Sequence, residues 1–296
     1  MIDDSRLEKH PFGFWRLANP PSPSELEAYY RDKYYQEGHA HYQASYTDKE
    51  RAYIDLKNAQ RAHQVGQLRG ESAGRFLDVG CGEGFAMELF HDMGWEVEGL
   101  DHSIAGVEAM SPKMADKVVC GDVFALLDER VSGEANYDLI WLSNVLEHVR
   151  DPLGLLNSLR KIVSDTGVLV VTVPNDGSEL QELLLADGDI AERFWVAIPD
   201  HLSYFTTDSL ERTLVETGWA CSEILADFPI DLFLLHSGSN YVREGANGRD
   251  AHQARVRTEL LLGEKGHGRV NEMYAAMARV GLGRKLTAFA TPGPRK

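Results

Sequence analysis

Short apolar runs alternate with amphipathic stretches from Arg75 onward. The runs read RFLDVG, WEVEGLD, KVVCGD, YDLIWLSN and VLVVTVPN, and the stretches between them, among them residues 151–167, have the apolar spacing of helices. Near-continuous apolar strands separated by helices are typical of a parallel sheet that is covered on both faces. Because such crossovers are right-handed, the pattern predicts an α/β fold built on a doubly wound, mostly parallel sheet.

The segments on either side of this region follow other patterns. Residues 1–70 are polar and rich in aromatic side chains; they predict helices near 24–36 and 48–67, and nothing in them resembles a strand. After the fifth apolar run, SELQELLL and residues 208–217 predict two helices, and CSEILADF predicts a strand. We therefore interpret residues 1–70 as an N-terminal helical cap.

A Gly-, Arg- and His-rich insertion, roughly Pro229 to Arg284, separates CSEILADF from a last predicted strand, KLTAFAT. The insertion is too long for a simple hairpin loop, and it predicts helices near 249–262 and 269–280. The chain thus divides into the cap, a central domain formed by 71–228 and 285–296, and a helical insertion over 229–284. Two additions to one domain predict an enclosed pocket and a small ligand.

The composition is that of an acidic globular protein. With 43% hydrophobic residues in 296, the chain can bury a sizeable core. Asp plus Glu total 46 against 30 Lys plus Arg, a formal charge of −16, which argues against a nucleic-acid partner. The same excess of acid suits a cationic or neutral small ligand.

Cysteine usage and hydropathy point to the cytoplasm. Cys81, Cys120 and Cys221 are odd in number and form no CxxC pair, so neither a disulfide framework nor a zinc knuckle is expected. No apolar stretch is long enough to span a bilayer, and the first residues, MIDDSRLEKH, lack the pattern of a signal peptide. We therefore expect a cytoplasmic protein with no membrane partner. A homodimer is compatible with the sequence.

A glycine-rich turn follows the first apolar strand and opens a helix. Gly80, Gly82 and Gly84 let the backbone approach a ligand closely, because glycine has no Cβ and tolerates positive φ. The spacing is GxGxG, whereas dinucleotide-binding turns have GxGxxG. Glu83 would repel a pyrophosphate but suits a ligand with a positive centre.

Aspartates follow the next two strands. Asp101 ends the strand about twenty residues past the turn, where a carboxylate can accept both ribose hydroxyls. Asp122 ends the third strand, where it could accept from an adenine amino group. Each aspartate alone could instead cap a helix. Together with Asp78 they place acids at successive carboxyl ends of parallel strands, which is where such sheets bind ligands.

As a set, DVGCGEG, VEGLD, CGD and YDLIWLSNVLEHVRDP resemble the seven-stranded, Rossmann-like (class I) S-adenosylmethionine-dependent methyltransferases. The resemblance runs from about Arg75 to Asp227, with a closing strand near 286–290. It implies S-adenosylmethionine as the cofactor and methyl transfer as the activity. For the cofactor's amino-acid part it implies contacts from Gly80, Cys81 and Gly82, with Asp78 and the carbonyl of Ser143 orienting its ammonium. For the nucleoside it implies Asp101 and His102 at the ribose, and Asp122 and Val123 around the adenine.

Two histidines are candidate catalytic residues. His148 in NVLEHV and His201 in PDHLSYFT follow the fourth and fifth strands, and an imidazole is a suitable base for a hydroxyl acceptor. Either histidine could instead order its loop. The sequence thus favours O-methylation of a small or medium acceptor, such as a secondary metabolite or a saccharide. N- or C-methylation by proximity and a non-catalytic cofactor-binding subunit are the alternatives.

A metal site is the less favoured interpretation. Similar quinone-biosynthesis and small-RNA methyltransferases carry an ExxEH motif, but Asn144 stands here in place of the first Glu. Glu147, His148 and His201 could still hold a cation, although losing a carboxylate weakens a Mg²⁺ site most. We therefore predict no metal.

The additions to the central domain contain further candidate ligand contacts. In the cap, Tyr29, Tyr30, Tyr34 and Tyr35 suit either an aromatic lid or simple packing. In the insertion, Arg255 and Arg257 could meet an acidic acceptor or form a solvated face. A third alternative is an enzyme that uses the same fold for another reaction, such as decarboxylation or carboxymethyl transfer. An additional cation in the pocket would point to it, and none is obvious from the sequence.

Overall fold

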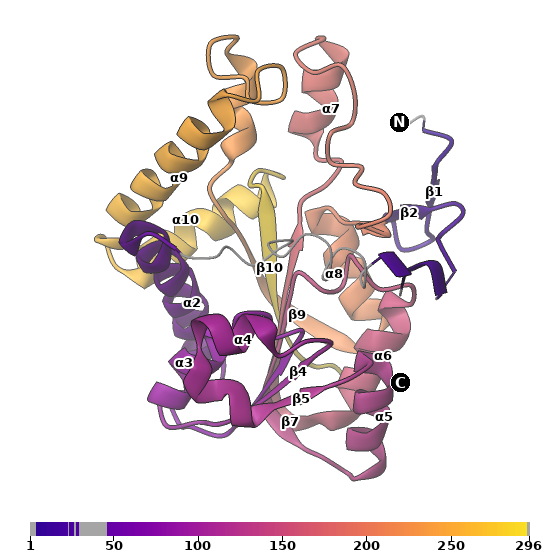
Figure 1. The fold of residues 1–296 in the computed structure, drawn as a ribbon, viewed down its shortest axis with the longest axis vertical. Helices are drawn as coiled ribbons and strands as arrows, with labels where there is room; N and C mark the ends of the chain where they lie inside the picture. The colour runs from indigo at the N-terminus through magenta and orange to yellow at the C-terminus, as the bar shows by residue number, and fades with distance from the viewer. Residues whose placement is uncertain (1–3, 23, 27, 30–45, 295–296) are drawn as a thin grey trace.

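A seven-stranded sheet forms the centre of the molecule (Figure 1). The computed structural model describes residues 4–22, 24–26, 28–29 and 46–294. The strand order is β5-β4-β3-β6-β7-β10-β9; the first five are parallel, and β10 is antiparallel to both β7 and β9. The predicted doubly wound, Rossmann-like fold is confirmed. The strands are β3 (Arg75–Val79), β4 (Glu96–Asp101), β5 (Val118–Cys120), β6 (Tyr137–Ser143), β7 (Val163–Pro174), β9 (Trp219–Ala226) and β10 (Lys285–Pro292).

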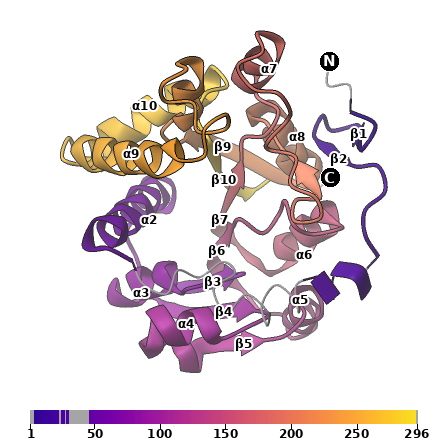
Figure 2. The same cartoon turned by 45° about the horizontal axis from the view of Figure 1, so that its top comes forward.

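Helices cover both faces of this sheet. Side chains alternate along each strand, so that Phe76 and Trp141 pack on one face and Leu77 and Leu142 on the other. Figure 2 shows α2 and α10 on one side of the strands and α6 and α8 on the other. The helices around the sheet are α2 (Asp48–Arg69), α3 (Phe85–Asp92), α4 (Ala105–Met110), η1 (Pro112–Lys117), α5 (Val123–Ser132), α6 (Pro152–Ile162), α8 (Thr207–Glu216) and α10 (His267–Arg279).

Local signals set the ends of several helices. Thr47 and Glu50 form a capping box that begins α2, and Asp151 caps α6 with Pro152 in its first turn. The helix predicted over 151–167 ends earlier, at Ile162, where the chain enters β7 directly. Its last predicted turn is wrong because Val163 already pairs with Tyr137 of β6.

The expectation that residues 1–70 contain no strand is wrong. β1 (Leu7–Lys9) and β2 (Trp15–Leu17) form a three-stranded antiparallel sheet with β8 (Ser203–Tyr204). These strands are too short to show an alternating pattern, and β8 comes from a distant part of the chain. The helix predicted near 24–36 and Tyr30, Tyr34 and Tyr35 lie mostly or wholly outside the described residues.

The helices predicted in and before the insertion are present. Helix α7 (Glu179–Ala186) follows β7, and η2 (Ile230–Leu235), α9 (Asn247–Gly263) and α10 lie between β9 and β10. Helix α9 packs on α2, where Lys57 and the buried Glu259 form an ion pair with Nζ 3.2 Å from Oε2. The division of the chain at 70, 228 and 284 stays a prediction.

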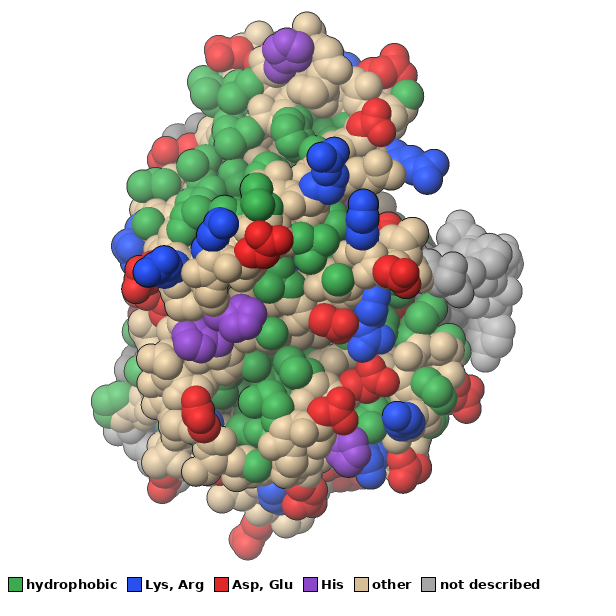
Figure 3. Space-filling view, turned by 90° about the vertical axis from the view of Figure 1, so that its left-hand side faces the viewer, with side chains coloured by type: hydrophobic (Ala, Val, Ile, Leu, Met, Phe, Trp, Pro, Cys, Tyr) green, Lys and Arg blue, Asp and Glu red, His purple; other side chains and the backbone are tan. Residues whose placement is uncertain are grey.

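The surface formed by α2, α3 and α9 is mixed in character. Figure 3 shows acidic and basic side chains interspersed on this face, with apolar side chains gathered in its upper part. Among the described residues, the helices are all too short or too polar to cross a bilayer.

Candidate functional site

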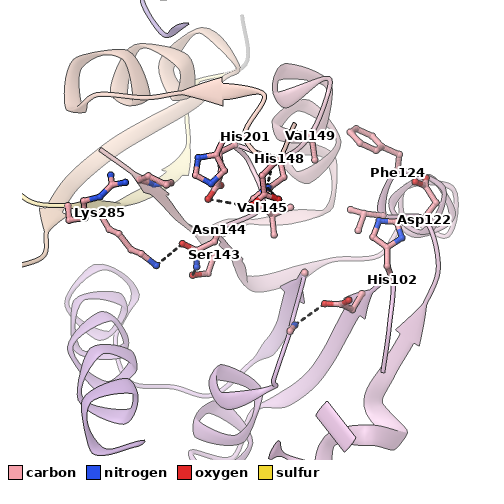
Figure 4. A pocket seen from close by; sticks show the side chains of 18 of the residues that line it. His102, Asp122, Phe124, Ser143, Asn144, Val145, His148, Val149, His201 and Lys285 are labelled. Carbon is pink, nitrogen blue, oxygen red and sulfur yellow. Dashed lines mark hydrogen bonds and ion pairs between the residues drawn. The ribbon is translucent and has the colours of Figure 1, made fainter. Parts of the chain in front are cut away.

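A cavity of about 690 Å³ opens along the carboxyl ends of the parallel strands. The antiparallel β10 begins at the same edge, because Lys285 pairs with Pro174, the last residue of β7. Figure 4 shows the side chains that converge there. Among the residues predicted from the sequence, the cavity is lined by Gly80, Gly82, Asp101, His102, Asp122, Val123, Ser143, His148 and His201.

The turn after β3 requires glycine. Gly80 has φ +72°, and a Cβ on it would lie 2.4 Å from Cγ2 of Val145. The N–H groups of Gly80 and Cys81 both donate to the carbonyl of Leu100 in β4, which draws the turn across the strand end. The backbone of Gly80 therefore lines the cavity directly, with no side chain in between.

Glu83 lies in the same turn but does not line the cavity. The hydroxyl of Tyr46 donates to both of its carboxylate oxygens, at 2.7 and 2.9 Å. Burial, and then the hydrogen bond to Glu83, raise the pKa of Tyr46 well above its usual range. Glu83 therefore anchors the segment before α2 to the turn, rather than facing a ligand.

The two aspartates that line the cavity are held in place by backbone groups. Asp101 accepts from the N–H of Gly82 at 2.8 Å and of Ser103 at 3.0 Å. Burial raises the pKa of Asp101, and these two hydrogen bonds oppose that effect. Asp122 caps α5 by accepting from the N–H of Ala125 at 2.9 Å. Asp122 therefore caps a helix and also lines the cavity. The cap uses only one of its two carboxylate oxygens.

Asp78 and Cys81 do not line the cavity. Asp78 is 3% exposed, and burial together with the nearby Asp101 raises its pKa to about 8. Cys81 is also buried, and its sulfur packs beneath Gly99 of β4. Because neither residue lines the cavity, a contact from either side chain to a ligand there would need a bridging water molecule.

Two imidazoles meet at the other end of the cavity. The rings of His148 and His201 lie 4.9 Å apart with an interplanar angle of 80°. Nδ1 of His148 is 2.7 Å from the carbonyl oxygen of Asp200, and Nδ1 of His201 is 3.5 Å from Oδ2 of the buried Asp176. Nδ1 of His148 is thus hydrogen-bonded, whereas Nδ1 of His201 is buried near a carboxylate without a hydrogen-bond partner among the described residues. In both rings Nε2 is the remaining atom that can accept a proton.

Glu147 lies beside these rings with only 1% of its surface exposed. Burial raises its pKa to about 7, and its Oε2 has no hydrogen-bond partner among the described residues. Oε1 is 3.7 Å from Nε2 of His148. One ligand atom from each of Glu147, His148 and His201 lies within 4.8 Å of the others, which is compatible with a metal ion.

The expectation of no further cation in the pocket is wrong. Arg255 of α9 and Arg284 and Lys285 at the start of β10 all line the cavity. Nζ of Lys285 donates to Oδ1 of Asn144 at 2.9 Å, a contact that Figure 4 shows. The sequence points to Arg255 as a possible contact for an acidic acceptor, but it gives no local sign of Arg284 and Lys285, because their positions depend on where β10 enters the sheet. Arg257, by contrast, is exposed and does not line the cavity.

Comparisons with known proteins identify the family. A family model described as a methyltransferase domain matches residues 48–224. The ubiquinone biosynthesis O-methyltransferase of Rhodopseudomonas palustris (strain BisB5) is 26% identical over 151 residues, 50% of this chain and 59% of that protein. Its counterpart from Histophilus somni is 30% identical over 115 residues, 37% and 48% of the two chains. The chain thus spans about three-fifths or less of the length of these curated relatives.

Solved structures share the fold at low identity. An S-adenosylmethionine-dependent methyltransferase from Archaeoglobus fulgidus aligns with a TM-score of 0.51 at 18% identity, covering 89% of this chain and 99% of that one. The 1,6-didemethyltoxoflavin-N1-methyltransferase of Burkholderia thailandensis, solved with S-adenosylhomocysteine, gives 0.54 at 14%, covering 99% of each chain. The chain belongs to the methyltransferase-domain family, and the family and fold predicted from its sequence, those of the class I S-adenosylmethionine-dependent methyltransferases, are confirmed.

Proposed function

We propose that this protein transfers the methyl group of S-adenosylmethionine to a hydroxyl oxygen of a small or medium organic acceptor. The observation that carries the proposal is the pair of imidazoles, His148 and His201, in the same cavity as the glycine turn. A hydroxyl must lose its proton to become a good nucleophile, and an imidazole near neutral pKa can take it.

The residues at the glycine turn fit the cofactor. Asp101 offers carboxylate oxygens for the ribose hydroxyls, and the backbone at Gly80 and Gly82 leaves room for the amino-acid part. His102, Asp122 and Val123 border the space where the adenine would lie. The carboxylate of Asp101, which lines the cavity, suits a ligand that carries an ammonium and a sulfonium. When bound, the cofactor supplies an electrophilic methyl group; alignment with the acceptor is the protein's task.

His201 is the better candidate for the base. Burial disfavours its charged form, but the carboxylate of Asp176, helped by those of Glu147 and Asp200, outweighs that effect, so the pKa of His201 is raised. Nε2 of His201 would take the proton of the acceptor hydroxyl, whose oxygen would then receive the methyl group that the bound cofactor supplies. Asp176 then stabilises the imidazolium. His148, ordered by the carbonyl of Asp200, would position the acceptor.

A metal-assisted reaction is the second candidate, because Glu147, His148 and His201 converge and Oε2 of Glu147 is buried without a partner. These three residues would hold the ion, and the ion would lower the pKa of the acceptor hydroxyl. Against it, Lys285 lies beside Asn144 and its ammonium attracts the Glu147 carboxylate, so a positive charge is already present there.

Methyl transfer to nitrogen or carbon is less favoured, because proximity alone would leave the two histidines without a role. The curated relatives methylate oxygen, as their names state, which supports the same choice.

The proposal is tested by incubating the protein with methyl-labelled S-adenosylmethionine and a panel containing a catechol, an aromatic amine and a simple saccharide. We expect label on a hydroxyl oxygen of a panel member, at the same rate with and without a chelator. Label only on nitrogen, or no label together with tight cofactor binding, would overturn the O-methyltransferase proposal. Loss of activity with the chelator, restored by a divalent metal ion, would favour the metal-assisted candidate.

A further inference from the structure

Three basic side chains line one end of the cavity in a chain whose formal charge is −16. Figure 4 places Lys285 on the far side of Ser143 and Asn144 from His102 and Asp122. The basic end is therefore separated from the residues proposed to hold the nucleoside. Of the three, Arg284 is already paired, because its guanidinium lies 2.6 Å from Oδ1 of Asp176 and 3.9 Å from Asp231.

Lys285 and Arg255 are different. Among the residues that the structure describes, neither has a carboxylate oxygen within 4.0 Å. The ammonium of Lys285 donates to a neutral amide oxygen, that of Asn144. The guanidinium of Arg255 lies 2.8 Å from Nδ1 of His252 and 5.5 Å from the ring centroid of Tyr53, while its Nε is buried without a hydrogen-bond partner.

The nearby acids do not neutralise this pair directly. Asp227 exerts the strongest attraction on Lys285, but its Oδ1 accepts the backbone N–H groups of Arg284 and Lys285, both at 2.8 Å. Glu147 also attracts Lys285, but its Oε1 lies 3.7 Å from Nε2 of His148, and among the described residues it forms no ion pair with Lys285. Arg61 adds a further positive charge to the surroundings.

Lys285 and Arg255 are both half-buried. Cations that are partly removed from water and lack a counter-ion are costly, and a ligand of opposite charge removes that cost. We propose that Lys285 and Arg255 form an anion subsite that binds a carboxylate of the acceptor, so that the substrate is a hydroxy acid. Its carboxylate lies against Lys285 and Arg255, and its hydroxyl lies toward His201. This inference rests on the proposed methyl transfer and narrows its acceptor class.

The test measures binding, so it does not depend on turnover. The protein is saturated with S-adenosylhomocysteine and titrated in a calorimeter with 3,4-dihydroxybenzoate and with the neutral 3,4-dihydroxybenzamide. We expect the carboxylate to bind at least about tenfold more tightly than the amide. Lys285→Met and Arg255→Met should each abolish most of that preference, whereas Lys285→Arg should retain it. Arg257→Met, on the same helix but exposed, serves as the control.

The carboxylate of the cofactor's own amino-acid part is the other possible occupant. To separate the two, the same variants are titrated with S-adenosylhomocysteine and with 5′-methylthioadenosine, which lacks that carboxylate. Our proposal predicts unchanged affinity for both. Equal affinity of the wild-type protein for 3,4-dihydroxybenzoate and 3,4-dihydroxybenzamide would overturn the proposal. So would variants that lose affinity for S-adenosylhomocysteine but keep their affinity for 5′-methylthioadenosine. Neither result bears on methyl transfer itself, which the labelling experiment tests separately.

Discussion

Asp176 lies behind His201, with Oδ2 3.5 Å from the Nδ1 atom of the imidazole. The carboxylate is 1% exposed, and its other oxygen binds the guanidinium of Arg284 at 2.6 Å. Because Arg284 orders the carboxylate and Asp176 faces the imidazole, the charge state of His201 depends on a buried network rather than on solvent. The raised pKa of His201 has a direct consequence for activity.

The rate of methyl transfer should rise with pH through the pKa of His201, because only the neutral imidazole can accept a proton. Asp176→Asn removes the group that raises this pKa, so the acidic limb of the kcat profile should move to lower pH. The measurement is kcat against pH for the wild type, for Asp176→Asn and for Asp165→Asn, an exposed control in β7. Superimposable limbs in all three proteins would contradict the role of His201.

Replacing the proposed base should affect chemistry and leave cofactor binding intact. We expect His201→Ala to lower kcat by about 10²- to 10⁴-fold, with S-adenosylhomocysteine affinity unchanged and the defect smaller at high pH. His148→Ala should raise KM more than it lowers kcat, since we assign this residue to positioning. Steady-state kinetics and calorimetry on both variants check this. The reverse pattern would make His148 the base.

The glycine turn tolerates no side chain at Gly80. Gly80→Ala places a Cβ 2.4 Å from Val145 in a left-handed backbone conformation, so we expect a loss of about 1–3 kcal/mol in the free energy of unfolding and weaker cofactor binding. Gly245→Ala is the control, because a Cβ there meets nothing within 4 Å. Denaturant unfolding measures the difference. Equal stability of the two variants would show that the turn is not constrained as described.

Asp78 should make the protein less stable as pH rises. Its folded pKa is about 8 against 3.8 for the ordinary side chain, so between these values the unfolded chain has lost a proton that the folded protein keeps. Stability contributed by the neutral acid is therefore present at pH 4 and is lost progressively toward pH 8. Asp78→Asn should raise the free energy of unfolding at pH 8, by on the order of a few kcal/mol, and have little effect at pH 4. Unfolding curves at the two pH values measure this, and a constant difference between wild type and variant would refute it.

The features that could be predicted from the sequence are those set by local patterns. The strand, glycine turn and helix around Gly80 are contiguous, and Asp101 ends the next strand, so both could be placed at one sheet edge from the sequence. The pattern along the strands does not show which aspartate faces the ligand. Asp78 lies near the end of β3 and Asp101 ends β4, but only Asp101 lines the cavity.

The remaining features depend on long-range pairing. Lys285 lines the cavity because β10 lies antiparallel between β7 and β9. The local sequence, GRKLTAFA, does not indicate that position in the sheet. Similarly, β1 and β2 exist only through pairing with β8 at Ser203 and Tyr204. Such contacts have no periodic signal in the sequence.

The cavity at the strand ends should hold S-adenosylmethionine, with Asp101 at the ribose. Calorimetric titration of S-adenosylmethionine into the wild type, Asp101→Ala and the exposed control Asp116→Ala tests it most directly. We predict binding by the wild type and the control, and affinity at least about tenfold lower in Asp101→Ala. Equal affinity in all three proteins would contradict the assignment of Asp101, and no binding by the wild type would contradict the account as a whole.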